Sequence, residues 1–438
     1  MIGKSLNVLV FNRMNFNKFL TIAAFFISLV PLTAPTRALA QTSQPSTAVT
    51  QGILPVPYRS NLYSETAAGR LSQAVAGALE RVYVPNRSAN TVSVIDPATL
   101  KVIDTLKVGV GPQHIVPSWD LQTLWVANNA EGRTDGSLTP INPRTGKVGA
   151  SIAVDDPYNL YWTPDGRYAI VVAEAFKRLD FRDPHSMKLA FSVDTPSCAG
   201  INHADFSMDG RYAVFTCEFG GAIIKIDLAQ RQVLETITLS PYFDRPDVLA
   251  LLAKPGKKLK RVADPAAKSD ATLNTAQGMP QDIRISPDGK LLFVADMVAA
   301  GLHVVDLEAF RQVGFIATGV GAHGLYPSRD GKSLYVANRG SNKIRGTAGG
   351  KGSVSVLDFA TRKIKTTWLV PGGGSPDMGN VSADGKYLWL SGRYDNEVYR
   401  FNTSSGAVDK LLVGREPHGL TVWPQPGRYS LGHTGNMR

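Results

Sequence analysis

Residues 81–109 read RVYVPNRSANTVSVIDPATLKVIDTLKVG. Apolar residues alternate there with polar or small ones, as in Val92-Ser93-Val94, and this period of two is typical of a β-strand. The pattern returns in residues 324–370, where GLYPSRDGKSLYVANRGSN precedes GSVSVLDFATRKIKTTWLV. A cassette of strands joined by Asp-Gly or Gly turns, repeated along one chain, predicts a repeat protein built from β-sheets.

The repeat is counted at the residue that closes its second strand. This position recurs at roughly 42 to 46 residues, the length of a four-stranded propeller blade, and two longer intervals imply insertions. Its occupants are Asn86, Asn128, Glu174, Glu218, Asp296, Asn338 and Arg393. Seven copies predict an all-β, seven-bladed β-propeller with four antiparallel strands per blade.

The two ends of the repeat predict how the ring closes. The first cassette, from Arg81, lacks its opening strand, whereas EPHGLTVWPQPG (residues 416–427) is an opening strand with no complete blade after it. Pairing the two completes the seventh blade and leaves no unpaired sheet edge. We therefore expect a C-terminal inner strand to join three N-terminal strands.

The strands Tyr83-Val84-Pro85-Asn86 and Tyr335-Val336-Ala337-Asn338 and the turn Ser-Pro-Asp-Gly-Lys (residues 286–290) resemble those of the YVTN-repeat family of seven-bladed propellers. The resemblance covers roughly residues 81–426. It implies the propeller fold and a relation to YncE-like periplasmic proteins, which are mostly binding proteins. Similar repeats occur in the haem-binding propellers of periplasmic nitrite reductases, so a metal or haem-type cofactor is a second implication.

The N-terminus has the features of a signal peptide in residues 1–40. Lys4, Arg13 and Lys18 precede an apolar run, and Ala38-Leu39-Ala40 offers small residues for cleavage before Gln41. An uncleaved anchor is the alternative. Residues 41–80 are then a lead-in, residues 81–426 one propeller domain and residues 427–438 a tail. We expect a periplasmic or secreted protein, and a monomer.

Charge is concentrated in one insertion, residues 240–278. The formal net charge of the chain is +11, from 47 Lys+Arg and 36 Asp+Glu. The basic residues of the insertion are Lys254, Lys257, Lys258, Lys260 and Arg261. Because the insertion joins an outer strand to the next inner strand, we expect it on the top face, defined as the face where inner strands begin. An insertion at this position is suited to contact with a partner protein. The positive charge also permits binding of nucleic acid or another polyanion, but does not favour it.

Cys198 and Cys217, the two cysteines of the chain, fall in one blade. In an oxidising compartment they are candidates for a disulfide, because one precedes the first strand and the other ends the second. Two free thiols, or a soft-metal site with His203, are the alternatives.

The starts of the inner strands should surround the mouth of the central channel. Aligned turns place there Gln113-His114, Tyr158-Asn159, Asn202-His203, Gln281-Asp282, His323-Gly324, Asp377-Met378 and His418-Gly419. The expected ligand pocket comprises His114, Asn159, His203, Asp282, His323, Asp377, His418, Arg339 and Arg393. His203, His323 and His418 are the candidate metal ligands. His185 and His303 are expected to be structural or exposed, as is His433, in a tail that leaves the opposite face.

The position that closes each second strand forms another ring, whose oxygen atoms would suit calcium and a lactonase-like hydrolysis. The simpler interpretation is that Asn at this position caps its own turn. The chain has no Ser-His-Asp elbow, HExxH or P-loop, and its GxGxxG at residues 319–324 lies between strands with no following helix. The residues therefore favour a non-enzymatic binding or scaffold propeller. The alternative is a cofactor-binding redox or maturation protein, and no cofactor is required.

Overall fold

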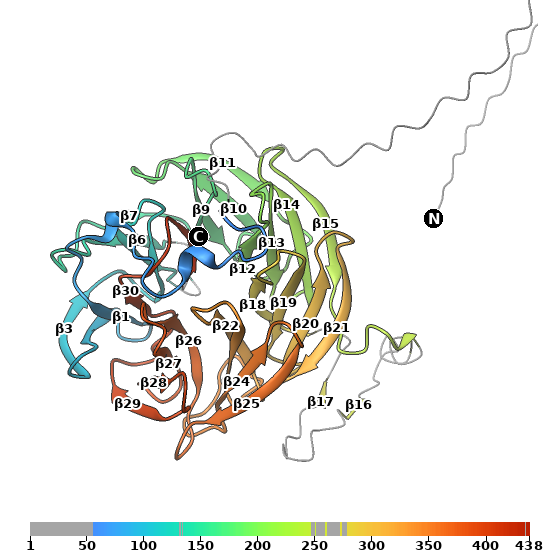
Figure 1. The fold of residues 1–438 in the computed structure, drawn as a ribbon. Helices are drawn as coiled ribbons and strands as arrows, with labels where there is room; N and C mark the ends of the chain where they lie inside the picture. Colours follow the sequence, from blue (N-terminus) through green and yellow to red (C-terminus); the bar gives the residue numbers. More distant parts are fainter. Residues whose placement is uncertain are drawn as a thin grey trace, which may run out of the picture. The chain divides into compact units, whose positions relative to one another are not determined.

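The computed structural model describes residues 56–130, 133, 135–246, 250, 259–260, 272–273, 278–433 and 435–438, all within the compact unit Val49–Arg438. Seven four-stranded antiparallel blades form a ring, so the predicted fold class is confirmed (Figure 1). Two short 3-10 turns, η1 (Ser64–Thr66) and η2 (Gln73–Val75), lie ahead of the first blade. No helix in these residues is long and apolar enough to cross a membrane.

Blades two to seven each follow one another along the chain, from an inner strand to an outer one. The inner strands are β4 (Pro112–Pro117), β8 (Pro157–Trp162), β12 (Ile201–Phe206), β18 (Pro280–Ile285), β22 (Ala322–Pro327) and β26 (Pro376–Val381). The second strands are β5 (Leu124–Asn128), β9 (Ala169–Ala173), β13 (Tyr212–Cys217), β19 (Leu291–Asp296), β23 (Ser333–Asn338) and β27 (Tyr387–Gly392). Inner strands are buried almost throughout, because neighbouring blades cover both of their faces.

The two remaining strands of each blade carry the sheet outwards. The third strands are β6 (Ser137–Ile141), β10 (Arg178–Arg182), β14 (Ala222–Asp227), β20 (Gly301–Asp306), β24 (Ser353–Asp358) and β28 (Glu397–Asn402). The outer strands are β7 (Ile152–Ala153), β11 (Leu189–Asp194), β15 (Gln232–Thr238), β21 (Arg311–Ala317), β25 (Lys363–Leu369) and β29 (Val408–Leu412). Outer strands are mostly exposed, so the apolar core lies between blades near the axis.

Blade one is completed by residues from both ends of the repeat. β1 (Arg81–Asn86) pairs with β2 (Thr91–Asp96), which pairs with β3 (Lys101–Lys107). On its other edge β1 pairs with β30 (Thr421–Trp423), with Val82 opposite Val422. The predicted closure is confirmed.

Each inner strand of blades two to seven has a register irregularity at its beginning. The shifts fall at Pro112/His114, Pro157/Asn159, Ile201/Ala204, Pro280/Ile283, Ala322/Leu325 and Pro376/Gly379. A β-bulge leaves an extra residue unpaired and re-aims its side chain. The bulges therefore explain how adjacent residues at this point, such as Gln113 and His114 or Asn202 and His203, come to face in different directions.

The opposite, bottom face is covered by the segments that flank the repeat. In the lead-in, Tyr63 packs in the core cluster of Ile283 and Ile285 and donates from its hydroxyl to the Ile285 carbonyl over 2.6 Å. The tail does not leave the fold. Its strands β31 (Ser430–Gly432) and β32 (Asn436–Met437) extend the sheet of blade three beside β8. The expectation for the tail is therefore wrong, because it enters the channel from below.

Most of the basic insertion, including Lys254, Lys257, Lys258 and Arg261, lies outside the described residues. Its described part includes a pair of two-residue strands, β16 (Leu259–Lys260) and β17 (Thr272–Leu273). Lys260 thus lies in a hairpin, and the role of the insertion as a partner arm remains a prediction.

Candidate functional site

The first residue of each predicted pair lies in a ring around the channel mouth. In order from blade one to blade seven, the members are His418, Gln113, Tyr158, Asn202, Gln281, His323 and Asp377. All seven are at least nine-tenths buried. Hydrogen bonds connect several of them directly or through one further side chain, which confirms that they converge. We call this set the mouth ring.

Asp377 is the centre of one side of the mouth ring. Its Oδ1 accepts a hydrogen bond from Nε of Arg339 over 2.6 Å, and its Oδ2 lies 2.8 Å from Nδ1 of His418. Nδ1 of His323 is 3.0 Å from Oδ1. Burial is the largest single influence and would raise the pKa of Asp377, but Arg339, His323 and Arg393 together outweigh it and hold the pKa below its usual range. The carboxylate is therefore ionised.

His418 is occupied on both of its ring nitrogens. Its Nδ1 faces Asp377, and its Nε2 lies 3.3 Å from a terminal guanidinium nitrogen of Arg393. Since a guanidinium only donates, Nε2 accepts and the proton is on Nδ1. His418 therefore has no free lone pair for a metal ion, which disfavours the predicted set of His203, His323 and His418.

Glu218 is the centre of the other side. Its carboxylate accepts from Nδ2 of Asn202 over 2.7 Å and from Nε2 of Gln281 over 3.0 Å. Both amides are thereby oriented with their carbonyl oxygens directed away from Glu218. Those two oxygens are buried and have no donor among the described residues, and the same holds for Oε1 of Gln113.

Glu174 lies close enough to Glu218 for the two carboxylates to titrate together. Burial, and then repulsion by Glu218, raises the pKa of Glu174 well above its usual range. Burial also raises the pKa of Glu218. Neither carboxylate forms an ion pair within the described part of the chain, and the raised pKa values favour a proton on this side of the mouth unless a cationic group takes its place.

A second tier of imidazoles lies deeper in the channel. Ring centroids are 4.4 Å apart for His203 and His433, 4.7 Å for His114 and His433, and 5.8 Å for His114 and His203. Burial lowers the pKa of His114 to about 3 and lowers the other two well below the usual range, so all three are neutral. The expectation that His433 belongs to a departing tail is wrong. The repeat pattern ends at β30 and gave no signal for this contact.

His114 has no hydrogen-bond partner at either ring nitrogen among the described residues. Its position depends on Gly419, because a Cβ at Gly419 would lie 2.0 Å from Nδ1 of His114. A buried imidazole that makes no hydrogen bond is costly unless water or a ligand supplies one. The second tier therefore offers hydrogen-bonding groups that a water molecule or a ligand would satisfy.

Asn159 and Asp282, also predicted for the pocket, connect blades instead. Asp282 accepts from the Leu325 N–H of the next blade over 2.9 Å and is paired with Arg284 at 2.9 Å. Asn159 accepts from the Leu160 N–H, and its Nδ2 lies 3.2 Å from Nδ1 of His203. A carboxylate oxygen of Asp282 still lies within 4.8 Å of ring nitrogens of His203 and His433, close enough for the three residues to bind one metal ion.

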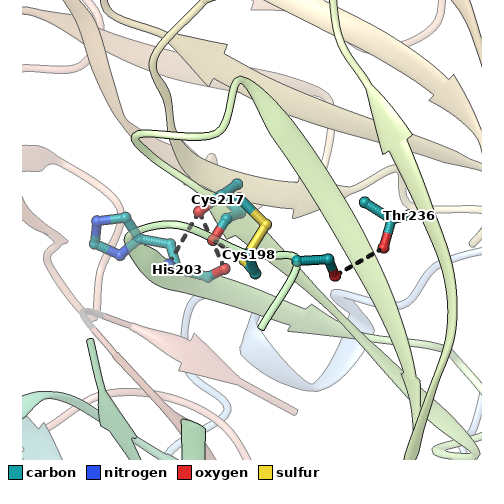
Figure 2. The surroundings of a disulfide bond; sticks show 6 residues. Cys198, His203, Cys217 and Thr236 are labelled. Atoms are coloured by element: carbon teal, nitrogen blue, oxygen red, sulfur yellow. Dashed lines mark hydrogen bonds between the residues drawn. A yellow bond between two sulfur atoms is a disulfide. The ribbon is translucent and has the colours of Figure 1, made fainter. Parts of the chain in front are cut away.

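Cys198 and Cys217 form a disulfide with a Cα–Cα distance of 4.9 Å. Figure 2 shows it beside His203, whose imidazole points away from the sulfur atoms. The hydroxyl of Thr216 accepts from the His203 N–H over 3.0 Å and holds the bulge in place. The bond therefore fixes the start of β12 to the end of β13, and free thiols and a cysteine metal site are excluded by the pairing.

The ring of second-strand ends is structural where asparagine occupies it. Nδ2 of Asn86 donates to Ser93, that of Asn128 to Thr139, and that of Asn338 to Ser355, over 2.8 to 3.0 Å. Asp296 accepts from two backbone N–H groups and contacts the buried His303. The three asparagines link second strands to third strands rather than capping turns, whereas Asp296 also caps its own turn through the Ala299 N–H. These contacts do not favour calcium. Glu174, Glu218 and Arg393, predicted for the same ring, each lie one residue beyond the end of the second strand and contribute to the mouth instead.

The fold is that of a seven-bladed β-propeller. Residues 33–195 match the model of the YNCE-like beta-propeller family, which confirms the resemblance over that part of the chain. No curated protein matches the chain.

Solved structures with the same fold include hydrazine synthase of Kuenenia stuttgartiensis, with 18% identity, a TM-score of 0.51 and coverage of 70% of this chain and 88% of that one. A putative 6-phosphogluconolactonase from Bacteroides uniformis has 16% identity, a TM-score of 0.55 and coverage of 78% and 98%. Dihydro-heme d1 dehydrogenase NirN in complex with DHE has 15% identity, a TM-score of 0.52 and coverage of 78% and 75%. At these identities the likeness shows the fold alone.

Proposed function

We propose that this protein is an extracytoplasmic, non-enzymatic binding propeller that holds a small polar ligand at the mouth of its channel. The observation that carries the proposal is the group of buried polar atoms without partners there. They include the side-chain oxygens of Gln113, Asn202 and Gln281, Nε of Arg393 and both ring nitrogens of His114. Since buried polar groups are nearly always hydrogen-bonded, their concentration at one place supports a ligand or bound water there.

The compartment is supported by two independent features. Disulfides persist in oxidising environments such as the periplasm, and Cys198 is bonded to Cys217. The basic and apolar leader in residues 1–40 is of the secretory type. Both favour export, as does the match to a YncE-like family.

Native mass spectrometry of the protein exported by its own leader tests the proposal. We expect an added mass that is released on unfolding. The variant Asn202→Leu/Gln281→Leu should lose it, whereas the control Gln230→Leu, at an exposed outer turn, should retain it. Protein that carries no small molecule after export and gains no thermal stability from any compound of a metabolite panel would contradict the proposal.

A metal-binding protein is the second candidate, favoured by the grouping of His203, Asp282 and His433. Two imidazoles and a carboxylate suit zinc or another late first-row metal. Against this, a hydrogen bond from the Asn159 amide to Nδ1 of His203 places the ring proton on Nε2, so a metal there would have to displace it. Zinc titration followed by metal analysis decides: stoichiometric binding lost in His433→Ala, but not in the exposed control His185→Ala, would support this candidate.

A further inference from the structure

The two halves of the mouth ring differ in charge. On blades six, seven and one, Arg339, Arg393 and Arg87 follow or close the second strands. On blades three and four, the corresponding residues are Glu174 and Glu218. Consecutive blades are neighbours in the ring (Figure 1), so the three arginines come from one side of the mouth and the two glutamates from the other.

Arg393 provides the unmatched positive charge on the first side. Arg339 is paired with Asp377 at 2.6 Å, and Arg87 is paired with Glu416 at 2.6 Å. Arg393 contacts the same Glu416 oxygen only at 3.4 Å, and its Nε is buried without a partner. Its guanidinium therefore has donor capacity for an additional anionic group.

The second side has acceptors in excess. The oriented amides of Asn202 and Gln281 each present a carbonyl oxygen that accepts no hydrogen bond from the described residues. The same is true of Oε1 of Glu174. Burial, and then repulsion by the Glu218 carboxylate, raises the pKa of Glu174. A cationic group between them would supply hydrogen-bond donors and remove that repulsion.

The two sides are within reach of one small molecule. The ring centroid of His114 is 5.5 Å from that of Tyr158 in blade three and 4.8 Å from that of His418 in blade one. A ligand with one charge would satisfy one side and leave the other uncompensated in a poorly hydrated site.

We propose that the mouth binds a small zwitterion of the amino-acid kind, with its carboxylate at Arg393 and its ammonium group between Glu174 and Glu218. The proposal rests on the proposed binding function and adds the charge pattern of the ligand. The amide oxygens of Asn202 and Gln281 would accept from the ammonium group, and Glu218 would fix their orientation.

Isothermal titration with matched probes tests the charge pattern. The probes are the ω-amino acids from glycine to 6-aminohexanoate, and for each chain length the acid that lacks the amine and the amine that lacks the carboxylate. We expect at least one zwitterion to bind roughly 10- to 100-fold more tightly than either of its halves, since a charge-assisted hydrogen bond contributes that much. If no zwitterion binds, or if a half binds as tightly as the whole, the proposal is overturned.

Variants assign the two ends. Arg393→Gln should reduce zwitterion affinity to that of the amine alone, and Glu218→Gln should reduce it to that of the acid alone. The pair of partly buried Arg400 and exposed Asp409, on the third and outer strands of blade seven, provides the matched controls Arg400→Gln and Asp409→Asn, which should leave binding unchanged. The probe comparison in the wild-type protein stands even where a buried variant fails to fold.

Failure of this inference is distinguishable from failure of the proposed function. A bound mass of another chemical class in native spectra, together with no affinity for the zwitterions, would overturn the charge assignment and leave the binding function intact. Absence of both would overturn the two together.

Discussion

Arg339 donates a hydrogen bond from Nε to Oδ1 of Asp377 over 2.6 Å, and both side chains are buried. The pair joins the end of β23 in blade six to β26 in blade seven. The same carboxylate contacts His418 of blade one. One carboxylate therefore connects three blades around the mouth, and its charge offsets that of Arg339.

Replacing this carboxylate should cost stability. Asp377→Asn leaves the Arg339 guanidinium buried without its counter-charge, and breaking a buried pair in this way costs about 3–5 kcal/mol. The pair of partly buried Arg400 and exposed Asp409 is the control, because Asp409→Asn should cost no more than about 1 kcal/mol. Urea unfolding measures both. Equal losses in the two variants would contradict the role assigned to Asp377.

Asp156 should make stability depend on pH. Burial raises its pKa from 3.8 to about 6 in the folded protein, so the native state holds the proton more tightly than the unfolded chain. Protonated Asp156 therefore contributes its full stability to the folded state below pH 3.8, and this contribution is lost as the pH rises through 6.

Asp156→Asn should therefore stabilise the protein at pH 8, by about 1 kcal/mol after allowance for solvent screening, and not at pH 4. Asparagine tolerates the positive φ of 43° at this position and can still accept from the Ala175 N–H. Urea unfolding at the two pH values measures the difference, with the exposed Asp104→Asn as the control. A gain that is the same at both pH values would contradict the assigned pKa.

The disulfide should contribute measurably to stability. Cys198 and Cys217 are 19 residues apart, and closing a loop of that length stabilises a fold by about 3 kcal/mol. Cys198→Ala/Cys217→Ala should lower the free energy of unfolding by about that amount, and reduction of the wild-type protein should have the same effect. No maleimide should react with the unfolded protein before reduction. Labelling at that stage would show that the thiols are free.

The position of the C-terminal tail beside β8 can be tested by substituting one glycine. A Cβ at Gly432 would lie 2.4 Å from the Leu160 carbonyl oxygen and 2.6 Å from Cα of Tyr161, and φ is +114°. Gly372 also has a positive φ, +73°, but nothing lies within 4 Å of its Cβ position. Gly372→Ala should cost about 1 kcal/mol from backbone strain, and Gly432→Ala at least about twice as much. Equal costs in urea unfolding would indicate that the tail does not occupy the channel.

The periodic part of the chain was predictable and the aperiodic part was not. Strand alternation and the Asp-Gly turns recur in every blade, so the ring, its closure by Val422 opposite Val82, and the convergence of His418 on Asp377 follow from register alone. His433 lies after the last repeat, where no period exists to place it. The roles of Asn159 and Asp282 were missed because a bulge re-aims two adjacent side chains differently, and sequence does not say which one faces the axis.

The pairing of Arg81 with Trp423 also constrains how the protein matures. During synthesis and export, β1 emerges long before its partner, so its inner edge stays open while six further blades form. A nascent chain in this state can recruit a foreign strand to that edge. Chaperones that shield exposed backbone edges should therefore matter most for this protein just before the last strand arrives, and dilution should favour correct closure over polymerisation.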